Sequence, residues 1–243
     1  MRLLVTRPEA DAVALRAKLT AMGHEVLIAP LLDIRFEPAP DIEAEEVQAL
    51  IATSRNGVRA LAQWPTADQM QDLPLFAVGP GTGSAARALG FRNVIEGPRD
   101  ASALITLIAM KADVNAEPLV HLAGNVKAVD VAGELRHLGF HVLEPVTYVA
   151  AASTEFDPRV VERFRSGQID GVLLMSPRTA RIYVKVLRKH GLERCSSRAV
   201  HYCLSQAVAD ALAGLPKLKI AAASRPNLNE MLALIARTAP QST

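Results

Sequence analysis

Two stretches of the chain, residues 2–30 and residues 118–145, share one pattern and decide the fold. The first reads RLLVTRPEADAVALRAKLTAMGHEVLIAP and the second reads PLVHLAGNVKAVDVAGELRHLGFHVLEP. Each begins with a short apolar run, continues through an alanine-rich amphipathic segment to a glycine, and ends with a second apolar run before a proline. This succession is typical of a strand, a helix and a second strand. The sequence therefore predicts one βαβ unit at the start of the chain and a copy near its middle.

Three further pairs of segments repeat in the same way. They are residues 49–61 with 171–183, residues 75–90 with 201–214, and residues 93–109 with 219–236. Apolar strands that alternate with helices are typical of parallel sheets covered on both faces. The predicted strands are Leu3–Thr6, Val26–Ala29, Ala49–Thr53, Leu75–Val78, Asn93–Glu96, Leu119–Leu122, His141–Leu143, Gly171–Met175, Val200–Leu204 and Lys219–Ala223. Ten strands are many for one open sheet, so we expect an α/β protein with two lobes of five strands each.

The order of the repeats bears on the domain organisation. A tandem duplication would give two complete lobes in succession, but the copy of the first unit lies near the middle of the chain. We favour a first lobe of residues 1–34 plus 152–243 and an inserted second lobe of residues 40–147, while tandem lobes remain the alternative. Residues 31–39 and 146–151 alternate their side chains or are rich in β-formers, so we expect them to be two paired extended connectors.

Composition excludes several classes of function. The net charge is only +2 over 243 residues, whereas nucleic-acid binders usually carry a strongly basic domain or stripe. The two cysteines form no CxxC motif and no cluster of His and Cys residues is present, so we expect reduced thiols and no metal site. No apolar run approaches the ~18 uncharged residues of a membrane span, and no signal peptide is recognisable. We expect a cytoplasmic protein.

Cations follow the ends of six predicted strands. Ligands of open parallel sheets bind beyond the carboxyl ends of the strands, where helices also begin with free N–H groups. The cations are Arg7, Arg55, Arg99, Lys127, Arg178 and Arg225. Ser54 and Ser176 stand in two of the same turns. Each cation alone could be a solvated surface residue, but six cations at the carboxyl ends of strands predict a site for a small polyanion.

Two other features could carry chemistry. The turn Gly79–Ser84 reads GPGTGS, which lacks the lysine of a P-loop and is not GxGxxG in register. It could be a backbone anion site, a nucleotide site, or a tight turn with Thr82 near a helix start. Tyr148 lies in the second connector, where its hydroxyl could reach the site or could only pack. The sequence shows no Ser-His-Asp, Cys-His or paired-carboxylate pattern, so catalysis would depend on binding and orientation.

Several short motifs, in order and spacing, carry a resemblance over nearly the whole chain. They are Val5-Thr6-Arg7-Pro8, Thr53-Ser54-Arg55-Asn56-Gly57-Val58, Val78-Gly79 with Thr82, Pro145-Val146-Thr147-Tyr148, and Met175-Ser176-Pro177. Together they resemble the uroporphyrinogen-III synthase family.

The resemblance implies two flavodoxin-like lobes joined by a two-stranded connector, with the first lobe split between the chain ends. It implies a linear tetrapyrrole substrate, hydroxymethylbilane, which bears eight carboxylates. The enzyme, a hydro-lyase of porphyrin and heme biosynthesis, removes water, inverts the last pyrrole ring and closes the macrocycle without cofactor or metal. It also implies that Tyr148 assists the departing hydroxyl, and that Thr82, Ser176 and Ser54 contact carboxylates. We expect a monomer.

One turn departs from the family pattern. The family commonly reads Gly-x-Thr-Ala where this chain reads Ser205-Gln206-Ala207-Val208, so the hydroxyl expected at Val208 is absent. Two alternatives therefore stay open. One is a non-enzymatic two-lobed protein that binds an organic polyanion, and the other is a nucleotide-dependent enzyme that uses Gly79–Ser84.

Overall fold

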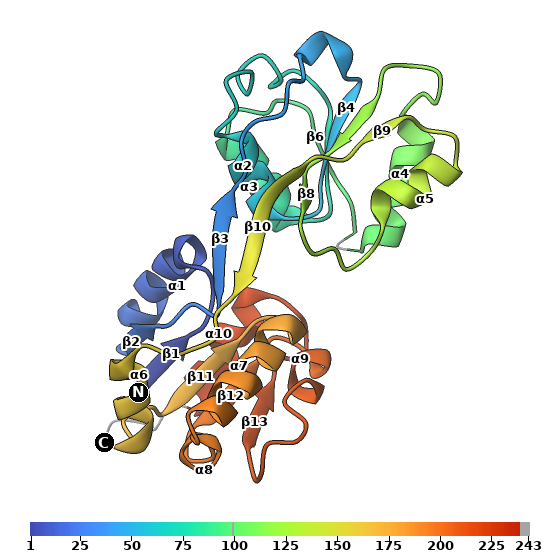
Figure 1. Cartoon of the computed structure of the whole chain (residues 1–243). Coiled ribbons are helices and arrows are strands. Elements are labelled where there is room, and N and C mark those ends of the chain that lie inside the picture. Colours follow the sequence, from blue (N-terminus) through green and yellow to red (C-terminus); the bar gives the residue numbers. More distant parts are fainter. Residues whose placement is uncertain (99, 239–243) are drawn as a thin grey trace. The chain divides into compact units, whose positions relative to one another are not determined.

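A computed structural model describes residues 1–98 and 100–238 of the chain (Figure 1). The chain divides into two compact units. The terminal unit comprises Met1–Asp33 and Ala151–Thr243, and the middle unit comprises Ile34–Ala150. Arg99, one of the predicted site residues, lies outside the described residues.

The terminal unit is built on a parallel sheet of five strands in the order β13-β12-β11-β1-β2. Their bounds are β1 Arg2–Val5, β2 Glu25–Ile28, β11 Gly171–Leu174, β12 Val200–Cys203 and β13 Lys219–Ala222. Both faces of the central strands are buried, as the continuous apolar run Gly171–Leu174 predicts.

Helices cover both faces of this sheet. Their bounds are α1 Glu9–Ala21, α6 Pro158–Arg165, α7 Pro177–Lys189, α8 Glu193–Ser196, α9 Gln206–Asp210 and α10 Leu228–Thr238. Leu15 of α1 and Ile235 of α10 share one apolar cluster with Leu3 of the sheet. Phe164 and Tyr183, from α6 and α7, pack in another cluster on the opposite face. The terminal unit is therefore a three-layer α/β sandwich.

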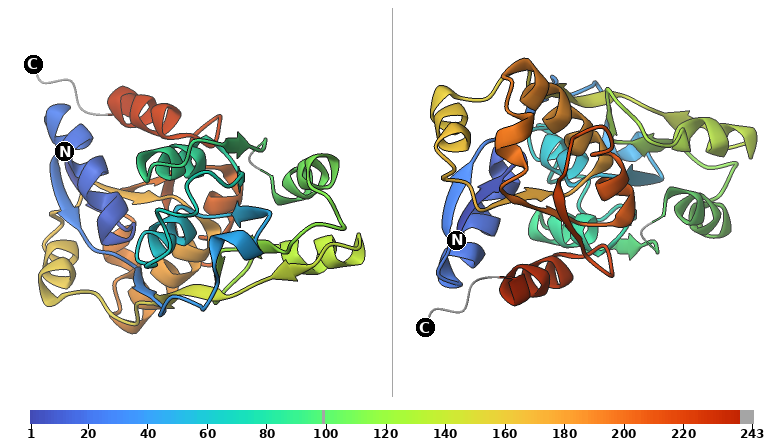
Figure 2. Two further views of the ribbon diagram at one scale, coloured as in Figure 1. Left: turned by 90° about the horizontal axis from the view of Figure 1, so that it is seen from above. Right: turned by 90° about the horizontal axis from the view of Figure 1, so that it is seen from below.

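The middle unit has the same three layers. Its sheet has the order β6-β5-β4-β7-β9, with all neighbours parallel. The strands are β4 Ala49–Ala52, β5 Leu75–Ala77, β6 Val94–Glu96, β7 Leu119–His121 and β9 Val142–Leu143. The helices are α2 Arg55–Leu61, α3 Pro80–Ala88, α4 Ala101–Lys111 and α5 Val131–His137, with a short 3₁₀ turn at Ala44–Glu46. α2 and α3 pack on one face of the sheet, and α4 and α5 lie side by side on the other (Figure 2).

The two sheets have the same strand order, but the chain enters them at different strands. Read from β2, the terminal order is β2-β1-β11-β12-β13, and read from β9, the middle order is β9-β7-β4-β5-β6. Both are the flavodoxin-like order 2-1-3-4-5, with β7 and β9 in the places of β1 and β2. Gly23 and Gly139, at the same point of the repeat, both take a positive φ (80° and 93°) after a helix. The repeat read from the sequence is thus a repeat of structure.

A small sheet lies where the chain passes between the units. It has the order β3-β10-β8, with β3 Leu32–Phe36, β10 Val146–Ala152 and β8 Ala123–Gly124. The backbone N–H of Glu37 donates to the Thr147 carbonyl at 3.0 Å. The sequence predicts only two connector strands. The third, β8, was missed because two small residues give no strand pattern of their own.

The two-lobed α/β fold and its five-stranded sheets are confirmed. Each of the ten predicted strands lies within one residue of an observed strand at both ends. The segment Gly79–Ser84 differs from a simple turn, because Pro80–Ala88 is helical and Gly79 is only its N-cap. Pro80 at the first helical position fits this start, since a helix needs no N–H there.

Candidate functional site

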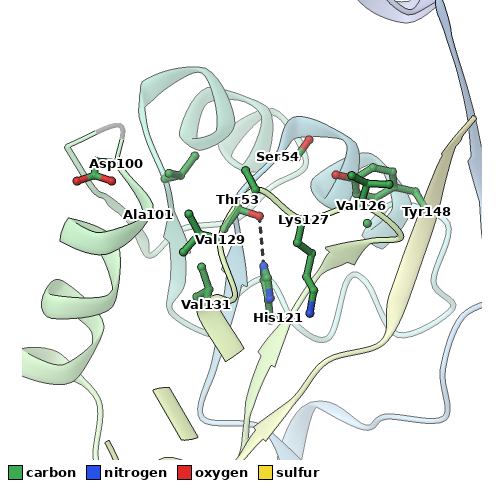
Figure 3. A pocket seen from close by; sticks show the side chains of 13 residues that line it. Thr53, Ser54, Asp100, Ala101, His121, Val126, Lys127, Val129, Val131 and Tyr148 are labelled. Carbon is green, nitrogen blue, oxygen red and sulfur yellow. Dashed lines mark hydrogen bonds between the residues drawn. The ribbon is translucent and has the colours of Figure 1, made fainter. Parts of the chain in front are cut away.

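A cavity of about 490 Å³ lies at the carboxyl edge of the middle unit's sheet (Figure 3). Its walls come from the residues after β4 and β5, the end of β7, the β8–α5 segment, the first residues of α4 and α5, and β10. The lining residues are Thr53, Ser54, Val78, Asp100, Ala101, His121, Gly124, Val126, Lys127, Ala128, Val129, Val131 and Tyr148. The cavity therefore lies where ligands of open parallel sheets bind.

The start of α2 positions Ser54 in this wall. Ser54 is the N-cap residue, and its Oγ accepts the backbone N–H of Asn56 at 3.1 Å. The glycine of the Asn56-Gly57 pair lets the helix approach β7 closely, because a Cβ at Gly57 would lie 2.6 Å from the Leu122 carbonyl oxygen. The hydrogen of the Ser54 hydroxyl is not used by the cap, so it can be donated to a ligand acceptor.

Tyr148 is held against the backbone of β8. A Cβ added to Gly124 would lie 2.5 Å from Cζ of Tyr148 and 2.7 Å from its hydroxyl oxygen. The N–H of Asn125 donates to the Tyr148 carbonyl at 3.1 Å, and Asn125 Oδ1 accepts the N–H of Ala150 at 2.9 Å. In the view of Figure 3, Tyr148 and Asp100 lie at opposite ends of the cavity. Gly124 therefore leaves room for the Tyr148 ring against the backbone of β8, and Asn125 holds the main chain around Tyr148.

Thr53 and His121 line the same cavity and form a polar trio with Glu144, which does not line it. The Thr53 hydroxyl lies 3.2 Å from His121 Nε2 (dashed in Figure 3), and His121 Nδ1 lies 2.9 Å from Glu144 Oε1. The His121 side chain is only 2% exposed and that of Glu144 is 13% exposed. Lys127 Nζ donates to the other oxygen of Glu144 at 2.7 Å and lies 3.5 Å from Asp130.

The protonation states within this trio follow from burial and from the partners. Burial lowers the pKa of His121, and this outweighs the hydrogen bond to Glu144, which raises it. Burial raises the pKa of Glu144, but hydrogen bonds from Lys127 and His121 bring it below its ordinary value. At neutral pH the trio therefore contains a neutral imidazole and a carboxylate.

Comparison of the sequence with models of protein families identifies the family of this chain. The family model for uroporphyrinogen-III synthase HemD matches residues 13–233. The chain belongs to the uroporphyrinogen-III synthase family. Members of this family are cyclising hydro-lyases, so the enzyme class predicted from the resemblance is confirmed.

Solved structures agree with this fold. The chain is similar to a mutant uroporphyrinogen III synthase from the extremely thermophilic bacterium Thermus thermophilus, with a TM-score of 0.60, 18% identity and 98% of each chain covered. It is similar to uroporphyrinogen-III synthetase from Helicobacter pylori, with a TM-score of 0.64, 15% identity, and 98% of this chain and 99% of the other covered. No curated protein sequence matched the chain. The fold is therefore shared at low sequence identity.

The cavity brings three of the residues predicted from the family motifs and strand ends together. Ser54, Lys127 and Tyr148 all line it. Arg55 is the first residue of α2, directly after the cap. Thr82 lies in the first turn of α3 and is buried, and it is not among the lining residues.

The remaining predicted residues lie at the carboxyl edge of the terminal unit's sheet. Arg7 follows β1, and its guanidinium pairs with Asp11 at 2.9 Å. Ser176 caps α7 by accepting the N–H of Thr179 at 3.1 Å, and Arg178 is the second residue of that helix. Arg225 follows β13 with its side chain 79% exposed. These residues thus share an edge within their own unit.

Packing against a neighbouring side chain explains the glycine at position 83 in the segment Gly79–Ser84. A Cβ added to Gly83 would lie 2.5 Å from Oε1 of Glu96, which also pairs with Arg87. The glycine therefore makes room for the neighbouring side chain. This accounts for Gly83 without a bound phosphate.

Sequence reasoning missed the polar trio as a unit. Thr53 appears only as part of a motif, and His121 only in the search for metal clusters. The signal was present in the repeat, because residues 118–145 carry His121 and Glu144 where residues 2–30 carry Val5 and Ile28. A polar residue at a position that is apolar in the other copy indicates a side chain that the shared fold does not require.

Three general properties of the described residues complete the site's description. None of their helices combines the length and the apolar character that a membrane crossing needs. No group of three or more His, Cys, Asp or Glu side chains among them has the arrangement of a metal site. Both thiols are free, and burial raises the pKa of Cys203 to about 12.

Proposed function

We propose that the protein cyclises hydroxymethylbilane to uroporphyrinogen III, with loss of water and inversion of the last pyrrole ring. The family match over residues 13–233 carries this proposal. The cavity of the middle unit supports it, because Tyr148, Ser54 and Lys127 meet there. We also propose that the protein acts as a monomer in the cytoplasm.

Tyr148 assists departure of the substrate hydroxyl. Its phenol transfers a proton to the hydroxymethyl oxygen as the C–O bond breaks, so that water leaves and an azafulvenium cation remains, stabilised by the pyrrole nitrogen. The phenolate recovers a proton when the ring carbon that is attacked later loses one. The packing of the ring supports this role, since the Tyr148 ring lies closely against Gly124 and its main chain is hydrogen-bonded to Asn125. A group that is already oriented needs no rearrangement when the bond breaks.

The serines and cations bind the carboxylates of the substrate. Ser54 can donate its hydroxyl hydrogen from the start of α2, and Thr82 and Ser176 supply further hydroxyls. Arg7, Arg55, Lys127, Arg178 and Arg225 supply positive charge, and we include Arg99 from its place in the sequence. Charge-assisted hydrogen bonds contribute about 1.5–3 kcal/mol each. Several of them hold the flexible substrate so that the substituted carbon of the last ring is attacked.

The product isomer tests the proposal. Hydroxymethylbilane generated enzymatically in the assay closes without enzyme to the type I isomer, in which the last ring keeps its orientation. We expect the purified protein to convert it to the type III isomer, as measured by chromatography of the oxidised porphyrins. Type I product alone, with tight binding of the linear tetrapyrrole, would instead identify a binding protein.

A further inference from the structure

The polar trio Thr53–His121–Glu144 occupies positions that the other unit fills with apolar side chains. The strand registers define the equivalence. β7 pairs with β4 and β9 as β1 pairs with β11 and β2. On this register the counterparts of His121, Glu144 and Thr53 are Val5, Ile28 and Met175.

These three counterparts belong to one hydrophobic cluster. Val5 is fully buried, and Ile28 and Met175 pack against it from the neighbouring strands. The fold is therefore built without a polar group at this place in the terminal unit. Since burying polar and charged groups costs free energy even when they are paired, stability gives no reason for the trio in the middle unit.

The hydrogen bonds of the trio run in one direction. Glu144 is ionised and can only accept, so Nδ1 of His121 carries the hydrogen and donates to it. The neutral imidazole then has a lone pair at Nε2, which accepts a hydrogen bond from the Thr53 hydroxyl. The hydrogen of Thr53 is thereby turned toward His121. Its oxygen keeps lone pairs on the cavity side.

We propose that His121 and Glu144 are positioning residues that fix the Thr53 hydroxyl as a hydrogen-bond acceptor for a pyrrole N–H of the substrate. This assignment rests on the proposed function, because it needs a ligand with N–H donors in the cavity. A carboxylate would be repelled by the same lone pairs.

The neighbouring hydroxyl has the opposite polarity. Ser54 Oγ accepts the Asn56 N–H, so its hydrogen is available to a carboxylate. Thr53 and Ser54 therefore present an acceptor and a donor side by side. Such a pair distinguishes the N–H edge of a pyrrole ring from its acidic side chains.

Protonation of His121 would reverse the Thr53 hydroxyl. An imidazolium donates from Nε2, so the Thr53 hydrogen would swing toward the cavity and oppose an N–H donor. The groups that act on this imidazole are Glu144 beside Nδ1, Lys127 on the other oxygen of Glu144, and Asp130 at the start of α5. Burial moves the pKa of His121 below 6.5, so the reversal requires a pH below that value.

Nitrogen NMR of the histidine side chains tests the direction of the trio without substrate. In the full chain labelled with ¹⁵N-histidine, we expect the His121 imidazole at pH 7.5 to be neutral with its proton on Nδ1. The His121→Val variant assigns the signal by its disappearance. A proton on Nε2 would overturn the inference while leaving the proposed function untouched.

Steady-state kinetics tests the contact with the substrate. We expect Thr53→Val, which keeps the shape and removes the acceptor, to raise KM roughly tenfold with little change in kcat, as loss of one hydrogen bond predicts. Thr53→Ser restores the oxygen and should stay within about threefold of the parent enzyme. An unchanged KM in Thr53→Val would refute the contact.

The pH profile separates positioning from simple packing. The parent KM should rise as the pH falls through the pKa of His121, and this rise should be absent in Thr53→Val and in His121→Val. His201→Asn is the matched control, because His201 is also buried and lies 3.0 Å from a hydroxyl, that of Tyr183 in the terminal unit. We expect that control to keep the parent KM profile. An acid rise that persists in His121→Val would contradict the proposal.

Discussion

The two units place different chemistry at the same position of one fold. In the middle unit the end of β7 carries His121, whose imidazole joins Thr53 to Glu144. In the terminal unit the end of β1 carries Val5 in a purely apolar cluster. The shared fold therefore does not require the polar groups, and the differences between the copies indicate where ligand chemistry has been added.

Each unit also contains a histidine that is at most 1% exposed, and the partners of these two histidines differ. His121 faces a carboxylate and Thr53, whereas His201 in β12 faces the Tyr183 hydroxyl within the apolar core. Burial lowers the pKa of His201 to about 4, and it lowers the pKa of His121 against the opposing effect of Glu144. The two units should therefore respond differently to acid.

The largest effect we expect is acid destabilisation through His201. Its unfolded pKa is near 6.5 and its folded pKa is about 4, so the neutral form stabilises the fold above pH 6.5. This contribution, roughly 3 kcal/mol, is lost as the pH falls from 6.5 through 4. Denaturant unfolding at several pH values measures it. We expect His201→Asn to be less stable at pH 7 and to lose less stability toward pH 4; a slope equal to that of the parent would contradict the assignment.

The next effect concerns Tyr148, which lines the cavity of the middle unit. We expect Tyr148→Phe to lower kcat by more than about tenfold, because the phenol no longer assists the departing hydroxyl. Steady-state formation of the type III isomer measures this. Circular dichroism should show an intact fold, since the ring itself remains.

Gly124→Ala offers an independent way to displace the same ring. A Cβ there would overlap the Tyr148 ring at 2.5 Å, so the ring must move. We expect a loss of kcat close to that of Tyr148→Phe. Unchanged turnover in both variants would remove Tyr148 from the chemistry.

Much of this architecture could be predicted because the strands of both units have recognisable apolar sequences. Runs such as Gly171–Leu174 are buried on both faces, and their apolar continuity is visible without coordinates. The turn residues Ser54 and Ser176 could also be predicted, because helix caps are local. Local signals therefore gave most of the fold and part of the candidate site.

The trio could not be found in this way, because its members meet only through strand pairing. His121 ends β7, whereas Thr53 and Glu144 follow β4 and β9, and none forms a motif with another in the sequence. The third connector strand, β8, was missed for a related reason. Ala123–Gly124 is too short for a pattern and is defined by its register with Val146 and Tyr148.

A smaller effect should come from the cations at the edge of the terminal unit's sheet. Arg7 already pairs with Asp11 at 2.9 Å, so its charge is partly compensated. We expect Arg7→Ala and Arg178→Ala each to raise KM about threefold at low ionic strength and less at high salt, because salt screens charge pairing. KM measured across a salt series checks this. Insensitivity of both variants would show that these arginines are surface residues outside the site.

The smallest net effect is expected of a double variant that copies the terminal unit's apolar pair into the middle unit. Glu144→Ile alone leaves the Nδ1–H of His121 buried without its acceptor, which should lower the free energy of unfolding by about 2 kcal/mol. The double variant His121→Val with Glu144→Ile reproduces Val5 and Ile28, and replacement of a buried polar pair by packed apolar groups is often neutral or stabilising. We therefore expect the double variant to unfold within about 1 kcal/mol of the parent. Denaturant unfolding at pH 7.5 compares the three proteins. If the double variant were as unstable as Glu144→Ile, the trio would be needed for the fold, and the contrast between the units would no longer indicate function.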